Sequence, residues 1–215
     1  GENATGSAFT VPGVLTAVGA FYIMKYELTE GQWVDFFNTL NSTQKTTRDI
    51  TSASGKNSDT TVYRNTVAWT GGTANATTTR SNRAMSYLSW MDGAAYCDWA
   101  GLRPITELEY EKAARGPLTA VSGEYAWGNT TITAAAAISG TENGTETIST
   151  SNANANYSST TFTGGDASSG PLRAGIFATS TSTRTTAGAG YYGVMELSGN
   201  TYERVVTVGD RKSVV

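Results

Sequence analysis

Two acidic residues flank a tight turn near the end of the chain. Glu196 and Glu203 stand on either side of the Ser-Gly-Asn sequence at residues 198–200. A turn of this kind can aim the backbone carbonyls of Gly199 and Thr201 at one point between the two carboxylates. Calcium prefers about six to eight oxygen ligands drawn from carboxylates, amides and carbonyls, so this segment could hold the ion. The alternative is that both glutamates are solvated side chains beside an ordinary turn.

The sequence offers few groups for other chemistry. It contains no histidine and one cysteine, Cys97. Without imidazole there is no general base of the usual kind near neutral pH and no imidazole ligand for copper. The many Ser and Thr hydroxyls lack a visible base to activate them. Cys97 cannot form a disulfide within the chain, and its place between Tyr96 and Trp99 predicts a small buried apolar side chain.

Composition indicates the surroundings in which the protein works. The 215 residues carry a net charge of −3 and are 15% charged, against roughly 25% in an average soluble domain. This balance gives no support for nucleic-acid binding, and no apolar stretch approaches the roughly 20 residues of a membrane span. A neutral, hydroxyl-rich exterior is common on secreted proteins, and a start at Gly1 rather than Met fits a removed leader or an expression boundary. We therefore expect a secreted or surface-displayed protein.

A pair of predicted helices at residues 89–116 forms the centre of the chain. Each opens with a capping box, in which two side chains satisfy unpaired amides of the first turn, and each closes at a glycine that can adopt a left-handed conformation. The capping boxes are Ser89 with Asp92 and Thr106 with Glu109, and the glycines are Gly101 and Gly116. Apolar bulk comes from Trp90, Tyr96, Trp99, Leu108 and Tyr110.

The other elements are predicted from patterning. Thr29 and Gln32 form a further capping box, followed by an amphipathic helix with Trp33, Phe36, Phe37 and Leu40 on one face. Residues 8–13 and 15–26 are expected to form short strands after a loose arm at residues 1–7. Residues 41–82 are expected to form a long polar loop with at most a strand at 62–69. Residues 132–148 are expected to be peripheral, residues 152–184 to be loops, and residues 8–215 to form a single domain.

Five segments resemble the formylglycine-generating, or sulfatase-modifying-factor, family, and they occur in the family order. The most specific covers residues 93–116, GAAYCDWAGLRPITELEYEKAARG. The family pattern there is Arg-Leu-Pro-Thr-Glu-x-Glu-Trp-Glu-x-Ala-Ala-Arg-Gly, in which this chain has Pro-Ile for Leu-Pro and Tyr for Trp. GEYAWGN at residues 123–129 and YYGVMELSGNTYERVV at residues 191–206 are similar to two further family segments.

The resemblance implies a fold and a core. The fold is an α+β, C-type-lectin-like domain with two or three helices, short twisted strands and much irregular structure. Four tryptophans at landmark positions are expected in the core: Trp33, Trp90, Trp99 and Trp127.

The resemblance also implies calcium as a cofactor. Family members bind calcium with the segment that matches residues 196–203, where Glu196 stands in place of the usual Asp or Asn and Glu203 matches the family Glu. Gly199 and Thr201 would supply carbonyls. The family's second calcium loop is matched by Asn156, Tyr157, Asp166 and Ser168, although Asn and Asp in such loops also serve as plain turn formers.

Three functions stay open at this point. The leading hypothesis is a non-enzymatic, secreted or surface-displayed, calcium-stabilised module for assembly or adhesion, such as a subunit of an extracellular filament or layer. The family's enzymes convert a substrate cysteine to formylglycine with copper and a pair of cysteines in a closing segment that lies outside this sequence, so an oxidase is an alternative. A lectin-like receptor with a variable C-terminal segment is another. Either the chain continues past Val215, or we expect self-association or a neighbouring subunit to complete the sheet.

Overall fold

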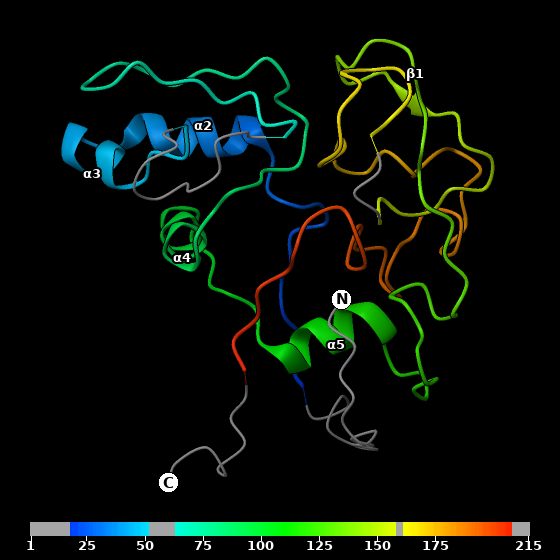
Figure 1. Ribbon diagram of the computed structural model, residues 1–215. Coiled ribbons are helices and arrows are strands. Elements are labelled where there is room, and N and C mark those ends of the chain that lie inside the picture. Colours follow the sequence, from blue (N-terminus) through cyan, green and yellow to red (C-terminus); the bar gives the residue numbers. More distant parts are fainter. Residues whose placement is uncertain (1–17, 52–62, 158–160, 208–215) are drawn as a thin grey trace, which may run out of the picture.

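The protein combines short helices and long irregular segments with a very small sheet that lies at one edge of the molecule, at the upper right in Figure 1. The computed structural model describes residues 18–51, 63–157 and 161–207, so the predicted arm at 1–7 and strand at 8–13 lie outside the described residues. The elements are α2 (Glu30–Thr39), α3 (Ser42–Thr47), α4 (Trp90–Trp99), α5 (Glu107–Arg115), β1 (Ile138–Ser139) and β2 (Thr147–Ile148). This mixture confirms the α+β prediction in its coarse form.

Helix α2 forms as its sequence predicts and builds the first core. The Thr29 hydroxyl accepts from the Gln32 amide at 3.3 Å, and the Gln32 side chain accepts from the Thr29 amide at 3.0 Å. The aromatic face beyond this cap is buried, with the Trp33 and Phe36 rings edge to face at 5.2 Å. The predicted capping box and amphipathic face are both confirmed, and together they fix where α2 begins and which side packs inward.

The central helices α4 and α5 also begin and end as predicted. The side chains of Ser89 and Thr106 accept hydrogen bonds from the third backbone amide of their helices. In turn, the side chains of Asp92 and Glu109 accept hydrogen bonds from the backbone amides of Ser89 and Thr106. Gly101 (φ +70°) follows α4, and Gly116 (φ +65°, ψ −141°) caps α5. Both positive φ values favour glycine, although the ψ of Gly116 lies outside the left-handed helical region. In Figure 1, α4 lies beneath α2, whereas α5 lies well below both.

Two of the four tryptophans predicted for the core are not buried. Trp33 and Trp127 are 0% and 2% exposed, but Trp90 and Trp99 are 38% and 46% exposed. Helix α4 turns its Tyr96 side toward α2. Trp99 still meets Phe36 of α2, with ring centroids 5.6 Å apart, but it stays partly exposed at the end of α4, as does Trp90 at the other end. The prediction was wrong for this pair because nothing in a short apolar helix says which side meets the neighbour.

A second core lies in the loop-rich half of the molecule, to the right in Figure 1. Strand β1 pairs antiparallel with β2, with Ile138 opposite Ile148. Ile138, Phe162 and Leu172 are buried together there. The expectation that residues 132–148 are peripheral was therefore wrong, because these residues supply both the sheet and part of this core. A third cluster joins α5 to the final segment through Ala113, Ala114, Ala126, Val194 and Leu197.

Two further local predictions need correction. Residues 41–82 are not all loop, since α3 opens with a capping box between Asn41 and Gln44. The only pairing within the described part of the predicted 62–69 strand is one bridge from Ala68 to Thr77. The described part of the predicted 15–26 strand, from residue 18 onward, has no regular strand assignment. The side chains in this segment still alternate between buried and exposed positions, although the backbone does not pair with a neighbouring strand. Phe21 and Ile23 pack on the third cluster, while Tyr22 is fully exposed.

Closing glycines provide a test of the packing around α5. A Cβ at Gly116 would lie 2.4 Å from two ring carbons of Tyr191, whereas a Cβ at Gly101 meets nothing within 4 Å. Both glycines have similar positive φ, so Ala at either position should cost about 1–2 kcal/mol of backbone strain. We expect Gly116→Ala to lose at least about 1 kcal/mol more than Gly101→Ala, because Tyr191 must also move. Urea unfolding of both variants measures this difference, and equal losses would contradict it.

Candidate metal centre

Three carboxylates gather where the final segment crosses the start of α2. Glu196 and Glu203 come from the predicted turn segment, and Glu27 precedes the cap of α2. The Glu27 carboxylate accepts from the Thr201 amide at 3.0 Å and from the Thr201 hydroxyl at 2.5 Å, and it also accepts from the Asn200 side chain. The Glu27 side chain therefore holds the turn in place.

Glu196 is the most buried member of this group and the least satisfied. Its residue is 5% exposed and adopts φ +57°, a region that non-glycine residues enter at a cost and that recurs at functional sites. One carboxylate oxygen, Oε1, accepts from the Gly175 amide at 2.6 Å. The other, Oε2, is buried and has no hydrogen-bond partner among the described residues. A buried oxygen without a donor is costly, so this atom calls for a positively charged partner.

Between the two predicted glutamates, the backbone folds back on another loop. Gly199 has φ +113°, and a Cβ there would lie 2.7 Å from the carbonyl oxygen of Asn156. The backbone amide of Asn200 donates a hydrogen bond to that same carbonyl oxygen, with a nitrogen-to-oxygen distance of 2.7 Å. Close approach of two backbones explains why glycine occupies this position. It also brings Asn156, from the second predicted calcium loop, against the first.

The three carboxylates disfavour one another's charge. Loss of hydration raises the pKa of Glu27 to about 7, against the lowering effect of its bonds from Thr201 and Asn200. Burial, followed by the charge of Glu27, raises the pKa of Glu196 to about 8. The same two causes raise the pKa of Glu203 to about 8. The Glu203 residue as a whole is nevertheless exposed to solvent, so loss of hydration weighs less on its pKa than on the pKa values of Glu27 and Glu196, and the charges of those two neighbours weigh more.

Any metal ion here would need backbone oxygens as well as carboxylates. No group of three His, Cys, Asp or Glu side chains within residues 18–51, 63–157 and 161–207 is arranged to hold a metal ion by itself. Calcium accepts carbonyl ligands readily, and the predicted set includes the carbonyls of Gly199 and Thr201. The chemistry of this donor set fits calcium, while a metal that demands side-chain ligands alone would find too few.

Glu27 was not among the predicted site residues. It lies two residues before the Thr29 cap, and the sequence shows only an acidic residue in a roughly alternating segment that also contains Lys25. The pattern places a charged side chain at a position that would be expected to be buried. It does not reveal which residue contacts that side chain. Only the fold brings Glu27 to Thr201.

The second predicted calcium set is not gathered in the same way. Asp166 pairs with Arg80, with Nη2 to Oδ1 at 2.7 Å, and with Arg83 at 2.5 Å. The Arg80 hydrogen bonds, helped by Arg83, hold the pKa of Asp166 far below its usual range. Tyr157 is 60% exposed, and the Ser168 hydroxyl is directed at the Ser169 carbonyl. A calcium ion at this loop would compete with two guanidinium groups for Asp166, and the second site stays a prediction.

Cys97 lies on α4, away from the carboxylates. It is partly buried, and burial raises the pKa of its thiol. A raised pKa lowers the fraction of reactive thiolate at neutral pH. The described surroundings of Cys97 therefore match a packing role, as predicted, and do not match an activated nucleophile.

Comparison with known proteins gives the class of the chain. A family model described as "Sulfatase-modifying factor enzyme 1-like domain" matches residues 1–212, so the chain belongs to the sulfatase-modifying-factor family. The described helices of this family member include none long and apolar enough to cross a membrane.

Its individual relatives match over shorter stretches. The chain is 45% identical over 58 residues to the formylglycine-generating enzyme of Thermomonospora curvata, covering 27% of this chain and 18% of that protein. It is 48% identical over 52 residues to the formylglycine-generating enzyme of Streptomyces coelicolor, covering 24% and 16%. It is also 52% identical over 44 residues to the inactive C-alpha-formylglycine-generating enzyme 2 of Mus musculus, covering 20% and 13%. Each match spans less than a fifth of the relative's length. No solved structure matches the chain.

The carboxylate cluster predicts an unusual pH dependence in the absence of divalent cations. Below about pH 4.5, the ordinary value, these glutamates are protonated in both the folded and the unfolded protein. As the pH rises from about 4.5 to between 7 and 8, the unfolded state ionises while the folded state holds its protons, so stability is lost over this range. We expect the urea midpoint in EDTA to fall between pH 5 and pH 8.5.

A matched variant isolates the cause of this fall. Glu196→Gln removes the most buried of the charges and should flatten the profile. The groups with lowered pKa, such as Glu109 and Asp166, lose their contribution only at acid pH and do not affect this window. A midpoint that rises steadily from pH 5 to pH 8.5 in EDTA would contradict the prediction.

Proposed function

We propose that this protein is a calcium-stabilised member of the sulfatase-modifying-factor family. The ion is held by the carboxylates of Glu196 and Glu203 and the carbonyls of Gly199 and Thr201, with the Glu27 carboxylate as a further oxygen donor. The observation that carries the proposal is the buried Oε2 atom of Glu196, which has no partner among the described residues and lies in a cluster of like charges.

Charge compensation is the physical basis of the proposal. At neutral pH the cluster must either bind protons or face mutual repulsion in a partly dry environment. A divalent cation lets all three carboxylates ionise at once. Because the cation binds the folded chain and not the unfolded one, its binding free energy adds to folding stability. This contribution matters for a protein whose segments are joined mainly by loops.

Calcium should stabilise the wild-type protein and not the Glu196→Gln variant. At a free calcium concentration one hundred times the dissociation constant, linkage predicts a gain of about 2.7 kcal/mol in the free energy of unfolding. In EDTA at pH 8, Glu196→Gln should be at least as stable as wild type, because a repulsive charge is gone. In calcium the order should reverse. Thermal and urea unfolding at pH 8 with and without calcium measure both effects.

Glu111→Gln serves as the control for this experiment. It makes the same chemical change on α5, where Glu111 pairs with Arg115 at the surface, and it should respond to calcium like wild type. Glu27→Gln should weaken the calcium response, because Glu27 is proposed as a donor. If calcium leaves the wild-type unfolding midpoint unchanged at pH 8, the calcium proposal is wrong.

A second candidate function is oxidation of a protein cysteine to formylglycine. The observation that favours it is the similarity to relatives that are named as formylglycine-generating enzymes. A relative named as inactive is equally similar, so similarity at this level does not separate the two outcomes. The residues present here do not fit copper, because the chain has no histidine and one partly buried cysteine. Under this proposal the reactive cysteine pair comes from outside the 215 residues.

Substitution of Cys97 tests where the reactive thiols lie. In an assay of the whole protein with copper, oxygen and a cysteine-containing peptide, aldehyde formation is followed by mass spectrometry. We expect Cys97→Ala to convert peptide at the wild-type rate, with a loss in stability of at most about 2 kcal/mol from the missing packing atoms. Loss of conversion in a folded Cys97→Ala variant would place the chemistry at this thiol. The absence of conversion by the wild-type protein would remove the oxidase candidate.

An assembly, adhesion or receptor role for a secreted protein with a C-type-lectin-like fold is kept as a further proposal. Its support is the neutral, hydroxyl-rich composition. The relatives' names favour the enzyme class over this role. Sedimentation of the whole protein at high concentration distinguishes a self-assembling protein from a monomer.

A further inference from the structure

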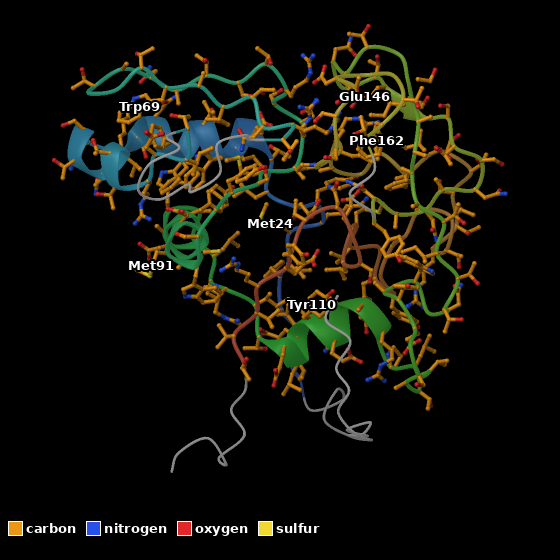
Figure 2. All side chains as sticks on the ribbon, in the orientation of Figure 1. Met24, Trp69, Met91, Tyr110, Glu146 and Phe162 are labelled. Carbon is orange, nitrogen blue, oxygen red and sulfur yellow. The ribbon has the colours of Figure 1, made fainter. Side chains whose placement is uncertain are left out.

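Two connected cavities lie between the start of α2 and the loop-rich half of the protein. The smaller has a volume of about 50 Å³ and the larger about 320 Å³. Both are lined by Asn82, Gly144 and Arg173, so they share a wall. The labelled Glu146, which lines the smaller cavity, lies on the loop-rich side in Figure 2. Glu27, a proposed calcium donor, also lines the larger cavity, but the other lining residues have no part in the proposed calcium site or in cysteine chemistry.

The smaller cavity has hydrogen-bond donors without acceptors. Arg83 lines it and is 2% exposed, and its Nε atom is buried with no partner among the described residues. Within the described part of the chain, Nη1 of Arg173 and the side-chain amide of Asn82 likewise have no acceptor, although both Arg173 and Asn82 are reached by solvent. A buried guanidinium nitrogen without an acceptor carries a desolvation cost, which an oxygen atom placed in the cavity would remove.

The carboxylate oxygens in the same wall already accept hydrogen bonds. Both oxygens of Glu142 accept hydrogen bonds, one from Arg64 and the Asp166 amide and the other from Arg64 and Arg83. Glu146 accepts from Arg173 at 3.0 Å and from the Gly144 amide at 2.8 Å. The wall therefore has spare donors and no spare carboxylate oxygen. A complementary ligand must bring acceptors.

The charges of the residues that line the smaller cavity limit which ligands can bind there. Three arginines line the smaller cavity, Arg80, Arg83 and Arg173, against two acidic residues, Glu142 and Glu146. Two further residues belong to the same ion-pair network, because Asp166 pairs with Arg80 and Arg83 and Arg64 pairs with Glu142. The count is then four arginines against three acidic residues, and a surplus of one positive charge suits a singly charged anion better than a doubly charged phosphate. A volume of about 50 Å³ exceeds that of one water molecule and has room for a carboxylate group, but not for the body of a larger ligand.

The larger cavity would take the body of the ligand. Its volume is at the lower end of ordinary ligand sites, which span roughly 300–1,000 Å³. Its wall combines the ring of Tyr26, which is 40% exposed, with the polar side chains of Glu27, Gln32 and Asn82. Gln32 uses its oxygen in the α2 cap, so its amide nitrogen remains a donor. An aromatic surface beside donors and one acceptor suits a compact, hydroxyl-bearing ring.

We propose that the two cavities form a binding site for a small sugar acid, with its carboxylate in the smaller cavity and its hydroxylated ring in the larger one. The carboxylate accepts from the guanidinium groups of Arg83 and Arg173. Asn82, at the junction, donates to the ligand where the two cavities meet. This site needs no metal ion and does not rest on the proposed calcium or oxidase functions.

Binding of glucuronate compared with glucose and acetate tests the proposal. Glucose keeps the ring without the carboxylate, and acetate keeps the carboxylate without the ring. By NMR titration or calorimetry of the whole protein at low salt, we expect glucuronate to bind with a dissociation constant of about 1 mM or lower, from the free energy per atom typical of small ligands. Its affinity should exceed that of glucose and of acetate by at least about tenfold. Equal affinity for glucuronate and glucose, or for glucuronate and acetate, would overturn the proposal.

Variants at the junction locate the binding. Asn82 is exposed and has no hydrogen bond from its side chain in the described structure, so Asn82→Ala should fold normally and weaken glucuronate binding by about fivefold. Arg173→Lys keeps the charge and loses the fork of donors, and it should weaken binding similarly, with its melting temperature checked. Asn75→Ala, an exposed asparagine elsewhere, is the matched control. Unchanged affinity in both junction variants would rule the site out.

Calcium separates this site from the carboxylate cluster. The glucuronate titration is repeated in EDTA and in calcium at a pH where both forms are folded. The same affinity in both buffers supports direct recognition by Arg83 and Arg173. Binding that requires calcium would instead place the ligand on the metal ion and overturn the assignment.

Discussion

The side chain of Asn200 holds together segments that are far apart in the sequence. Its oxygen accepts from the Leu172 amide at 2.8 Å and from the Asn156 side chain at 3.0 Å, and its nitrogen donates to Glu27. In a protein whose named strands are two residues long, few backbone groups are satisfied by a ladder. Side-chain amides must take that role, because a buried peptide group without a partner is costly. The arrangement of Glu27 around the final turn depends on this residue.

The protein contains two contrasting groups of acidic residues. Glu142 and Asp166 are surrounded by Arg64, Arg80 and Arg83, and their pKa values are lowered because guanidinium groups and amides offset the effect of burial. Glu27 and Glu196 accept hydrogen bonds from amides but form no ion pair among the described residues, and burial raises their pKa values. A cation from solution can therefore compensate the second group, while the first is already neutralised by the chain itself.

The calcium and ligand-binding proposals involve neighbouring parts of the molecule that share Glu27, whereas the oxidation proposal involves neither part. Calcium relates to the final turn, where buried charge is uncompensated. Ligand binding relates to the arginine-lined wall, where donors exceed acceptors. Oxidation chemistry relates to thiols that the 215 residues do not supply, since Cys97 is set into α4 with a raised pKa. The relatives of this chain include proteins named as enzymes and proteins named as inactive. Sequence similarity to this family is therefore found in more proteins than the enzymatic activity is.

The sequence by itself determined the features that depend on neighbours along the chain. The capping boxes at Thr29, Ser89 and Thr106, the buried face of α2 and the closing glycines of α4 and α5 each follow from residues within a few positions of one another. The family segments could be recognised for the same reason. Even α3, which the prediction missed, carries a local signal in the Asn41 and Gln44 pair.

Only the tertiary structure decided how distant charges are paired. Glu27 and Thr201 are 174 positions apart, and Asp166 meets Arg80 and Arg83 rather than the loop of Asn156. The partial exposure of Trp90 and Trp99 likewise depends on which side of α4 meets α2. From the local sequence alone, a charged group could pair with any of several opposite charges, and an aromatic ring could pack against any of several apolar surfaces. The packing of the whole chain decides which of these partners each group meets.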